Sequence, residues 1–102
     1  MSPKFYRLLG LCQRAGRLAS GEVQAEAAVA GGRGKLILLA TDASENTKKK
    51  WKNSAAFYAL PLQAAGSRTD LGRALGEEER AVVVVTDEGF AAKLTALAEE
   101  TI

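Results

Sequence analysis

Two uninterrupted apolar runs constrain the fold of this chain more than any other feature of its sequence. Residues 36–40 read Leu-Ile-Leu-Leu-Ala, and residues 82–85 are four consecutive valines. Polar residues do not alternate with apolar ones in either run, so each predicts a strand that is covered on both faces, as in α/β proteins. A chain with two such strands needs helices on both sides of its sheet.

The same turn follows both runs. The first leads into Thr41-Asp42 and the second into Thr86-Asp87. Asp42 with Glu45 fits a capping box, and Ser44 is a second candidate for the first residue of a helix. We therefore predict the same unit twice, consisting of a strand, a tight turn and a helix.

The other elements are predicted from apolar spacing and from residues that begin or end helices. They are a helix from Ser2-Pro3 to about Gly16 with Phe5, Leu8, Leu9 and Cys12 inward; a short strand at Leu18-Ala19; helices over Glu22–Ala30 and Ser44–Asn53; a strand over Phe57–Leu60; a short helix over Thr69–Leu75; and a last helix from about Gly89 to the C-terminus with Phe90, Leu94 and Leu97 inward. This order predicts an α/β fold, a three-layer αβα sandwich with a mixed four-stranded sheet, in one domain over residues 1–102.

Composition excludes several classes of protein. The chain has 102 residues, of which 47% are hydrophobic and 25% are charged, as in ordinary soluble domains. Cys12 is the single cysteine and there is no histidine, so we expect no internal disulfide, no ordinary zinc site and no cofactor. No segment has the roughly 18 to 20 apolar residues of a membrane span, and the N-terminus lacks a signal sequence. We expect a cytoplasmic monomer that does not contact membranes.

Charge is distributed unevenly along the chain. Residues 1–53 hold ten Lys or Arg and four acids, a balance of +6, whereas residues 54–102 hold four and eight, a balance of −4. A basic face attracts phosphates even when the whole molecule carries only +2. If Arg33, Lys35 and Arg68 flank the start of the second helix, they and the amides of 21–23 form an anion-binding surface. The alternative is that these charges only keep the helices soluble.

Two further motifs have ordinary structural interpretations. The sequence GGRG at 31–34 follows a helix and precedes a strand, the opposite order to a nucleotide-binding loop, so it predicts a helix end and a turn. Trp51 stands among Lys48, Lys49, Lys50 and Lys52. With Ala55 it is expected to face the core, although an exposed ring beside lysines would stack on a nucleic-acid base.

The chain resembles the bacterial YlxQ-like branch of the ribosomal protein L-seven-Ae and L-thirty-e superfamily, the kink-turn RNA-binding proteins. The resemblance is carried by Asp42-Ala43-Ser44 with Asn46-Thr47, by Leu71-Gly72-Arg73 with Gly76, and by Thr86-Asp87 with Gly89-Phe90. It covers nearly the whole chain. It implies an αβα sandwich and a non-enzymatic protein that binds structured RNA.

The resemblance also implies a site. In the family, RNA is held by the start of the second helix, a lysine on that helix and the loop before the last strand. The family's Asn-Glu pair falls on Val23 and Gln24, and its lysine falls on Ala27. The last loop carries three glutamates at 77–79, which should repel phosphate. The expected RNA-binding residues are Gly21, Glu22, Val23, Gln24, Arg33, Lys35, Arg68 and Arg80.

Three functions are consistent with these observations. The first is an RNA-binding accessory protein of ribosomal or other kink-turn-like RNA, with translation-machinery proteins as further partners. The second is a protein-interaction module of the translation or transcription apparatus on the same fold. The third is an enzyme in which Asp42 and Asp87, at the ends of two strands, hold Mg²⁺ for phosphoryl transfer.

Overall fold

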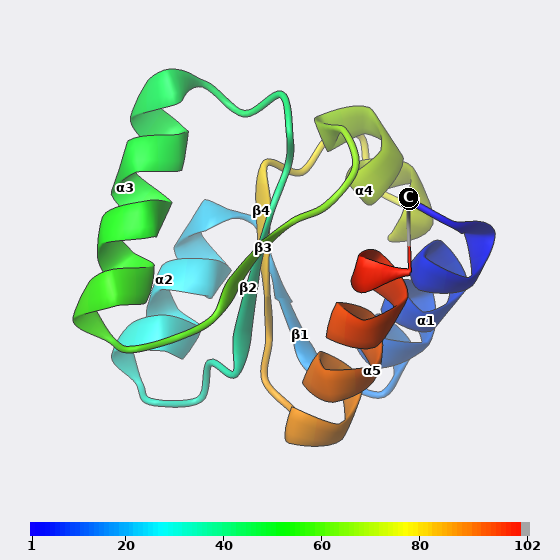
Figure 1. Cartoon of the computed structure of the whole chain (residues 1–102), viewed down its shortest axis with the longest axis horizontal. Helices are drawn as coiled ribbons and strands as arrows, with labels where there is room; N and C mark the ends of the chain where they lie inside the picture. Colours follow the sequence, from blue (N-terminus) through cyan, green and yellow to red (C-terminus); the bar gives the residue numbers. More distant parts are fainter. Residues whose placement is uncertain (101–102) are drawn as a thin grey trace.

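A computed structural model describes residues 1–100, whose helices and strands surround one four-stranded sheet (Figure 1). The elements are α1 (Pro3–Arg14), β1 (Leu18–Ser20), α2 (Glu22–Ala30), β2 (Leu36–Leu39), α3 (Glu45–Phe57), β3 (Leu62–Ala64), α4 (Arg68–Ala74), β4 (Val82–Val85) and α5 (Glu88–Glu99). The last helix ends close to where the sequence predicts its end. Residues 101–102, which that prediction also includes, lie outside the described residues.

The sheet is mixed and is covered on both faces. Its strand order is β1-β4-β2-β3. Strand β4 is antiparallel to both β1 and β2, whereas β2 and β3 are parallel. Helices α2 and α3 cover one face, and α1, α4 and α5 cover the other (Figure 1). The predicted αβα sandwich is confirmed.

The two apolar runs are the central strands and form the middle of the core. All four residues of β2 and all four of β4 are buried. Phe5, Leu9 and Cys12 of α1 pack on one side of them, and Trp51 and Ala55 of α3 lie buried on the other. The predicted inward stripe of α1 and the core position of Trp51 are therefore confirmed.

The strand predicted over Phe57–Leu60 is wrong. Helix α3 continues to Phe57, whose side chain is 82% exposed, and Ala59 then takes a positive φ of 55° that ends the helix. The strand comes after Pro61 instead, at the edge of the sheet. Proline has no N–H to donate, but its carbonyl accepts from the Ile37 N–H at 2.9 Å and begins the pairing with β2.

Side-chain caps begin four of the helices. Ser2 caps α1, Ser44 caps α3, Ser67 caps α4 and Asp87 caps α5, each by accepting from the amide three residues later. Each cap satisfies one of the amides that have no partner within the helix. No helix within residues 1–100 is both long enough and apolar enough to cross a membrane.

Cys12 is an inert core residue. Its side chain is fully buried, and its Sγ donates to the Arg17 carbonyl at 3.3 Å. Burial, and secondarily the Asp87 carboxylate, raise the pKa of this thiol to about 11. At neutral pH it is therefore protonated and a poor nucleophile.

Candidate nucleic-acid interface

The direction of each strand decides at which edge of the sheet the predicted site residues lie. Strands β1, β2 and β3 end at one edge of the sheet, where β4 begins, because Ser20 pairs with Val83 and Leu39 pairs with both Val82 and Ala64. We call this the upper edge. It consists of residues 20–21, 40–43, 65–68 and 80–81, at the top of the sheet in Figure 1. The start of α2 lies here.

The start of α2 is open to solvent. Gly21 occupies the cap position with a φ of 88°, which only glycine adopts readily, and it provides no side-chain cap. Its N–H donates to the Val82 carbonyl at 3.2 Å, which ties the helix start to β4. Val23 is 82% exposed and Gln24 is exposed beside it. The first amides of α2 therefore point towards solvent at the positive end of the helix dipole.

Arg80 lies directly against this helix start. Its Nε donates to Ser20 Oγ at 2.9 Å, and its Nη1 donates to the Glu79 carbonyl at 2.7 Å. A side chain at Gly21 would bring its Cβ to 3.8 Å from Arg80 Nε. Glu77 pairs with Arg80 at 3.0 Å and offsets part of its charge. The arginine is thus fixed in position beside the α2 amides.

Arg68 extends the cationic part of the upper edge. The Arg68 carbonyl accepts from the Arg80 N–H at 3.0 Å, so the two residues are neighbours. The Arg68 guanidinium lies 3.7 Å from Asp42 and 3.9 Å from Glu79. Both partners are partly exposed, so each pair is weak and open to competition from another anion.

Asp42 does not cap the helix that follows it, and that prediction is wrong. Ser44 is the cap of α3 and accepts from the Thr47 N–H at 3.1 Å. The Asp42 carboxylate instead accepts from the Arg68 N–H at 2.8 Å, at the start of α4. The turn after β2 therefore holds Arg68 at the upper edge, a long-range contact that a local capping pattern does not contain.

Glu22 takes part in a bridge between two helices. Lys50 of α3 donates to Glu22 at 2.9 Å and also to Glu26, both on α2. The hydrogen bond to Glu26, followed by that to Glu22, raises the pKa of Lys50 above its usual value. This bridge joins α2 to α3, and it engages a lysine that would otherwise be available for phosphate.

Arg33 and Lys35 do not flank the start of α2, and that prediction is wrong. They follow the end of α2, which runs from the upper edge to the opposite one. The Lys35 N–H donates to the carbonyl of Val85, the last residue of β4, and its Nζ lies 3.9 Å from Glu88. Arg33 does share a pocket of 240 Å³ with Gln24 and Ala27, on the flank of α2 beside β1.

Asp42 and Asp87 cannot form one metal site. They follow β2 and β4, which are antiparallel, and therefore lie at opposite edges of the sheet. Asp87 is occupied as the cap of α5, where it accepts from the Phe90 N–H at 2.9 Å. Within residues 1–100 no group of three or more His, Cys, Asp and Glu is placed to hold a metal ion. The magnesium-enzyme interpretation, which needed the two carboxylates together, is wrong.

Sequence reasoning missed two residues that position the upper edge. Ser20 orients Arg80, and Gly72 lets the segment 77–80 lie against α4. A Cβ at Gly72 would be 2.7 Å from the Glu78 carbonyl carbon, too close for any side chain. A glycine inside a short predicted helix was a signal for such close approach, whereas nothing local to Ser20 indicated its partner 60 residues away.

Comparisons with known proteins agree with this architecture. The chain is 45% identical over 94 residues to the RNA-binding protein YlxQ of Bacillus subtilis, covering 92% of this chain and 94% of the relative. It is 38% identical to a protein of the same name from Enterococcus faecium, covering 94% and 92% respectively.

Two solved structures share the fold. A protein of unknown function from Bacillus halodurans superposes with a TM-score of 0.90 at 43% identity, covering 96% of this chain and 99% of that one. A 15.5kD RNA-binding protein of Giardia lamblia superposes with a TM-score of 0.75 at 18% identity, covering 100% and 93%. Residues 3–95 match the model of one protein family. The chain belongs to the ribosomal protein L7Ae/L30e/S12e/Gadd45 family.

Proposed function

We propose that this protein binds structured RNA, without catalysing a reaction, through the start of α2 and the arginines of the upper edge. The observation that carries the proposal is the open helix start, with Arg80 held against Gly21. Helix N-termini bind phosphate through free amides and the helix dipole, and arginine adds a donor for the same oxygens. Relatives at 45% and 38% identity are named RNA-binding proteins, which supports RNA as the anion.

The RNA-binding residues of this proposal lie around the start of α2 and along the upper edge, with one on the flank of α2. They are Gly21, Glu22, Val23, Gln24, Arg68 and Arg80, with Arg33 on the flank of α2. Lys35 belongs to the opposite edge and is not included. Gln24 offers a donor and an acceptor to a base edge, whereas Val23 offers only apolar surface. The proposed RNA is ribosomal or another kink-turn-like RNA in the cytoplasm, bound by a monomer through its one domain.

The test compares two pairs of cations with equal charge. In Arg68→Gln/Arg80→Gln both changes fall at the upper edge, and in the control Lys35→Gln/Lys49→Gln neither does. We expect the first variant to bind kink-turn RNA more weakly, with a salt slope that is flatter by about one unit for each phosphate that it no longer neutralises. The control should retain the wild-type slope. Equal weakening in the two variants would mean that general attraction, and not this site, holds the RNA.

A second candidate function is a protein-interaction module on the same surface. It is favoured by Val23, which exposes 82% of its side chain, and by the three glutamates at 77–79. An exposed apolar residue together with an acidic loop suits a basic protein partner better than RNA. Capture of a translation or transcription protein that survives nuclease and is abolished by Val23→Asp would favour this candidate.

A further inference from the structure

A row of cations lies on α1, in the helical layer opposite α2. Lys4, Arg7, Leu11 and Arg14 follow one another at intervals of three, four and three residues, so they occupy one side of the helix. We call them the α1 stripe. It extends over about 15 Å at the usual rise of an α-helix. Residues 1–21 contain four Lys or Arg and no acid, so the stripe has no acidic neighbour on its own segment.

The cations of the stripe are free of ion pairs, whereas two of the four lysines on α3 are paired. Lys4, Arg7 and Arg14 are exposed and take part in none of the ion pairs found within residues 1–100. On the lysine-rich helix α3, by contrast, Lys48 pairs with Glu45 and Lys50 pairs with two glutamates of α2. Half of the lysines on α3 are therefore neutralised by carboxylates, whereas the cations of the α1 stripe keep their charge.

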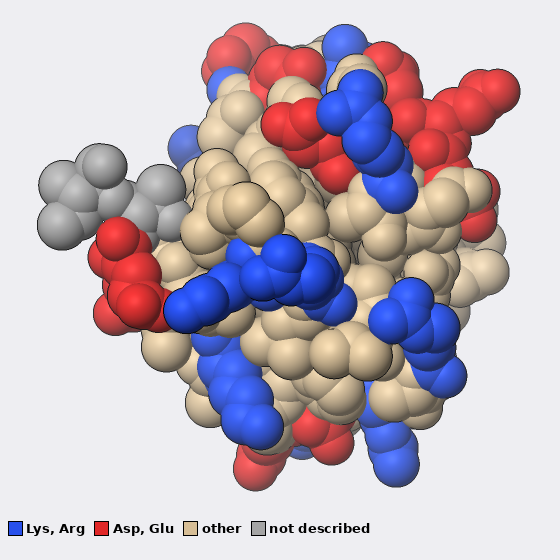
Figure 2. Space-filling model, turned by 90° about the vertical axis from the view of Figure 1, so that its right-hand side faces the viewer, with Lys and Arg blue, Asp and Glu red and all other residues tan. Residues whose placement is uncertain are grey.

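The stripe borders a groove in the middle of its face. Helix α1 packs against both α4 and α5. A cavity of 410 Å³ between α1 and α4 is lined by Arg7, Leu11 and Arg14 on one wall and by Ala74 on the other. In Figure 2 the Lys and Arg side chains cross the middle and lower part of this face, whereas most acidic side chains lie along its upper border. The groove thus has two cations, Arg7 and Arg14, along its α1 wall.

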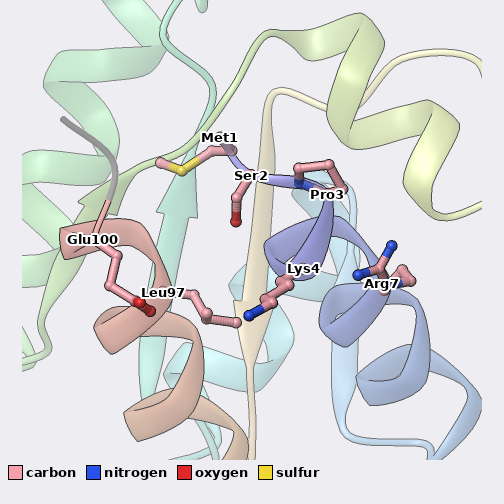
Figure 3. A pocket seen from close by; sticks show the side chains of 7 residues that line it. All are labelled: Met1, Ser2, Pro3, Lys4, Arg7, Leu97 and Glu100. Carbon is pink, nitrogen blue, oxygen red and sulfur yellow. The ribbon is translucent and has the colours of Figure 1, made fainter.

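Two acidic residues adjoin the stripe and set its limits. Asp70 of α4 lies 3.6 Å from Arg73, so its charge is offset locally. Glu100 lines a separate pocket of 670 Å³ with Lys4 and Arg7 at the start of α1. Figure 3 shows Arg7 directed away from Glu100, towards the outer side of α1. The positive surface is accordingly widest from Arg7 to Arg14.

We propose that the α1 stripe is a second RNA-contacting surface, which binds the phosphate backbone of a segment other than the one held at the upper edge. This rests on the proposed function. A row of unpaired cations beside a shallow groove matches a regular row of phosphates, which are bound by charge and not by a deep pocket. The sheet separates α1 from α2 (Figure 1), so the same nucleotides cannot touch both surfaces. The protein therefore clamps two parts of one RNA or bridges two RNAs.

The first experiment removes the charge of the stripe. The variant Lys4→Gln/Arg7→Gln/Arg14→Gln is compared with Lys35→Gln/Lys49→Gln/Lys52→Gln, which removes the same charge from positions outside the stripe. The probe is purified ribosomal RNA, and both variants are checked by circular dichroism. We expect the stripe variant to bind at least tenfold more weakly at low salt, with a salt slope smaller by about two to three units, and the control to change little. Equal effects, or none, would overturn the proposal.

The second experiment locates the RNA. Fe(II)-EDTA is tethered to a cysteine at Leu11→Cys or at Val23→Cys, since the native Cys12 is buried, and hydroxyl-radical cuts in the same RNA are mapped. Two separate sets of cuts support the proposal. Overlapping sets of cuts, or no cuts from position 11, contradict it. So does a wild-type protein that binds anionic phospholipid vesicles tightly while the stripe variant keeps its full affinity for RNA. Absence of RNA binding by the wild type would instead refute the proposed function.

Discussion

Single residues decide how the upper edge is assembled, and the smallest of them has the strictest requirement. Gly72 sits in α4 with the backbone of Glu78 and Glu79 where a side chain would be. That close approach fixes the segment that carries Arg80, whose Nε reaches Ser20. Hydrogen bonds of modest strength and one steric contact thus place a cation beside the start of α2. Each depends on a residue whose type alone does not suggest a role in binding.

The first prediction concerns this steric contact. In Gly72→Ala the new methyl group would lie 2.7 Å from the Glu78 carbonyl carbon, so the segment 77–80 must move. Overpacking of this kind typically costs about 1 to 3 kcal/mol. We expect a decrease of that size in the free energy of unfolding in urea, together with weaker RNA binding because Arg80 shifts. The control, Arg73→Ala, changes the exposed neighbouring position and should leave stability within about 0.5 kcal/mol. Full stability in Gly72→Ala would show that the segment relaxes freely.

At the scale of elements, the local sequence predicts whether a segment forms a helix or a strand. It does not predict which other elements lie beside that segment. The runs at 36–40 and 82–85, the apolar spacing and the residues that begin and end helices were sufficient for most helices and strands. Two of the errors in the site share one cause, because the sequence pattern does not give the direction of the strands. Because β4 runs antiparallel to β2, Asp42 and Asp87 are separated. For the same reason Lys35, beside the end of β4, lies far from the start of α2, beside the beginning of β4.

The start of α2 is the element that carries the next prediction. Val23, Gln24 and Ala27 are all exposed and lie on adjacent turns of one helix. The change Val23→Asn, Gln24→Glu, Ala27→Lys supplies a base-reading pair and a phosphate contact without altering net charge. If each restored contact contributes about 1 to 3 kcal/mol, affinity for a kink-turn RNA should rise at least tenfold at moderate salt. Electrophoretic mobility-shift titrations measure this affinity.

Two controls separate site recognition from general attraction. The first is a duplex without the kink, for which the gain should be small. The second is Ala92→Lys/Ala96→Glu, which adds the same two charges to exposed positions of α5. A triple variant that binds both RNAs more tightly to the same degree, or binds neither better, would show that this protein does not use the site that its family resemblance implies. The protein-interaction function would then be favoured.

At the scale of the whole molecule, the residues that form the core and those proposed to bind RNA lie in different places. The residues that fold the chain lie in β2 and β4 and face both layers, and they were recognisable in the sequence because burial on both faces removes polar alternation. The proposed binding residues lie around the rim and on α1, where charge is tolerated anywhere. Sequence pattern is therefore informative about the core, and structure is needed to show which cations are paired and which are free.

The last prediction tests this separation with one substitution at two valines. Val84 is fully buried in β4, between β1 and β2, whereas Val23 is 82% exposed. Aspartate at position 84 places a charge with no partner in the middle of the sheet. The cost of several kcal/mol is comparable to a typical total stability of about 5 to 15 kcal/mol. Val84→Asp should therefore lose its cooperative thermal transition in circular dichroism and its slowly exchanging amides.

Val23→Asp should unfold like the wild type and bind RNA less well, because it adds a carboxylate where phosphate is proposed to lie. A folded Val84→Asp protein would mean that β4 is not the centre of the core, since a buried strand has no solvent with which to stabilise the new charge.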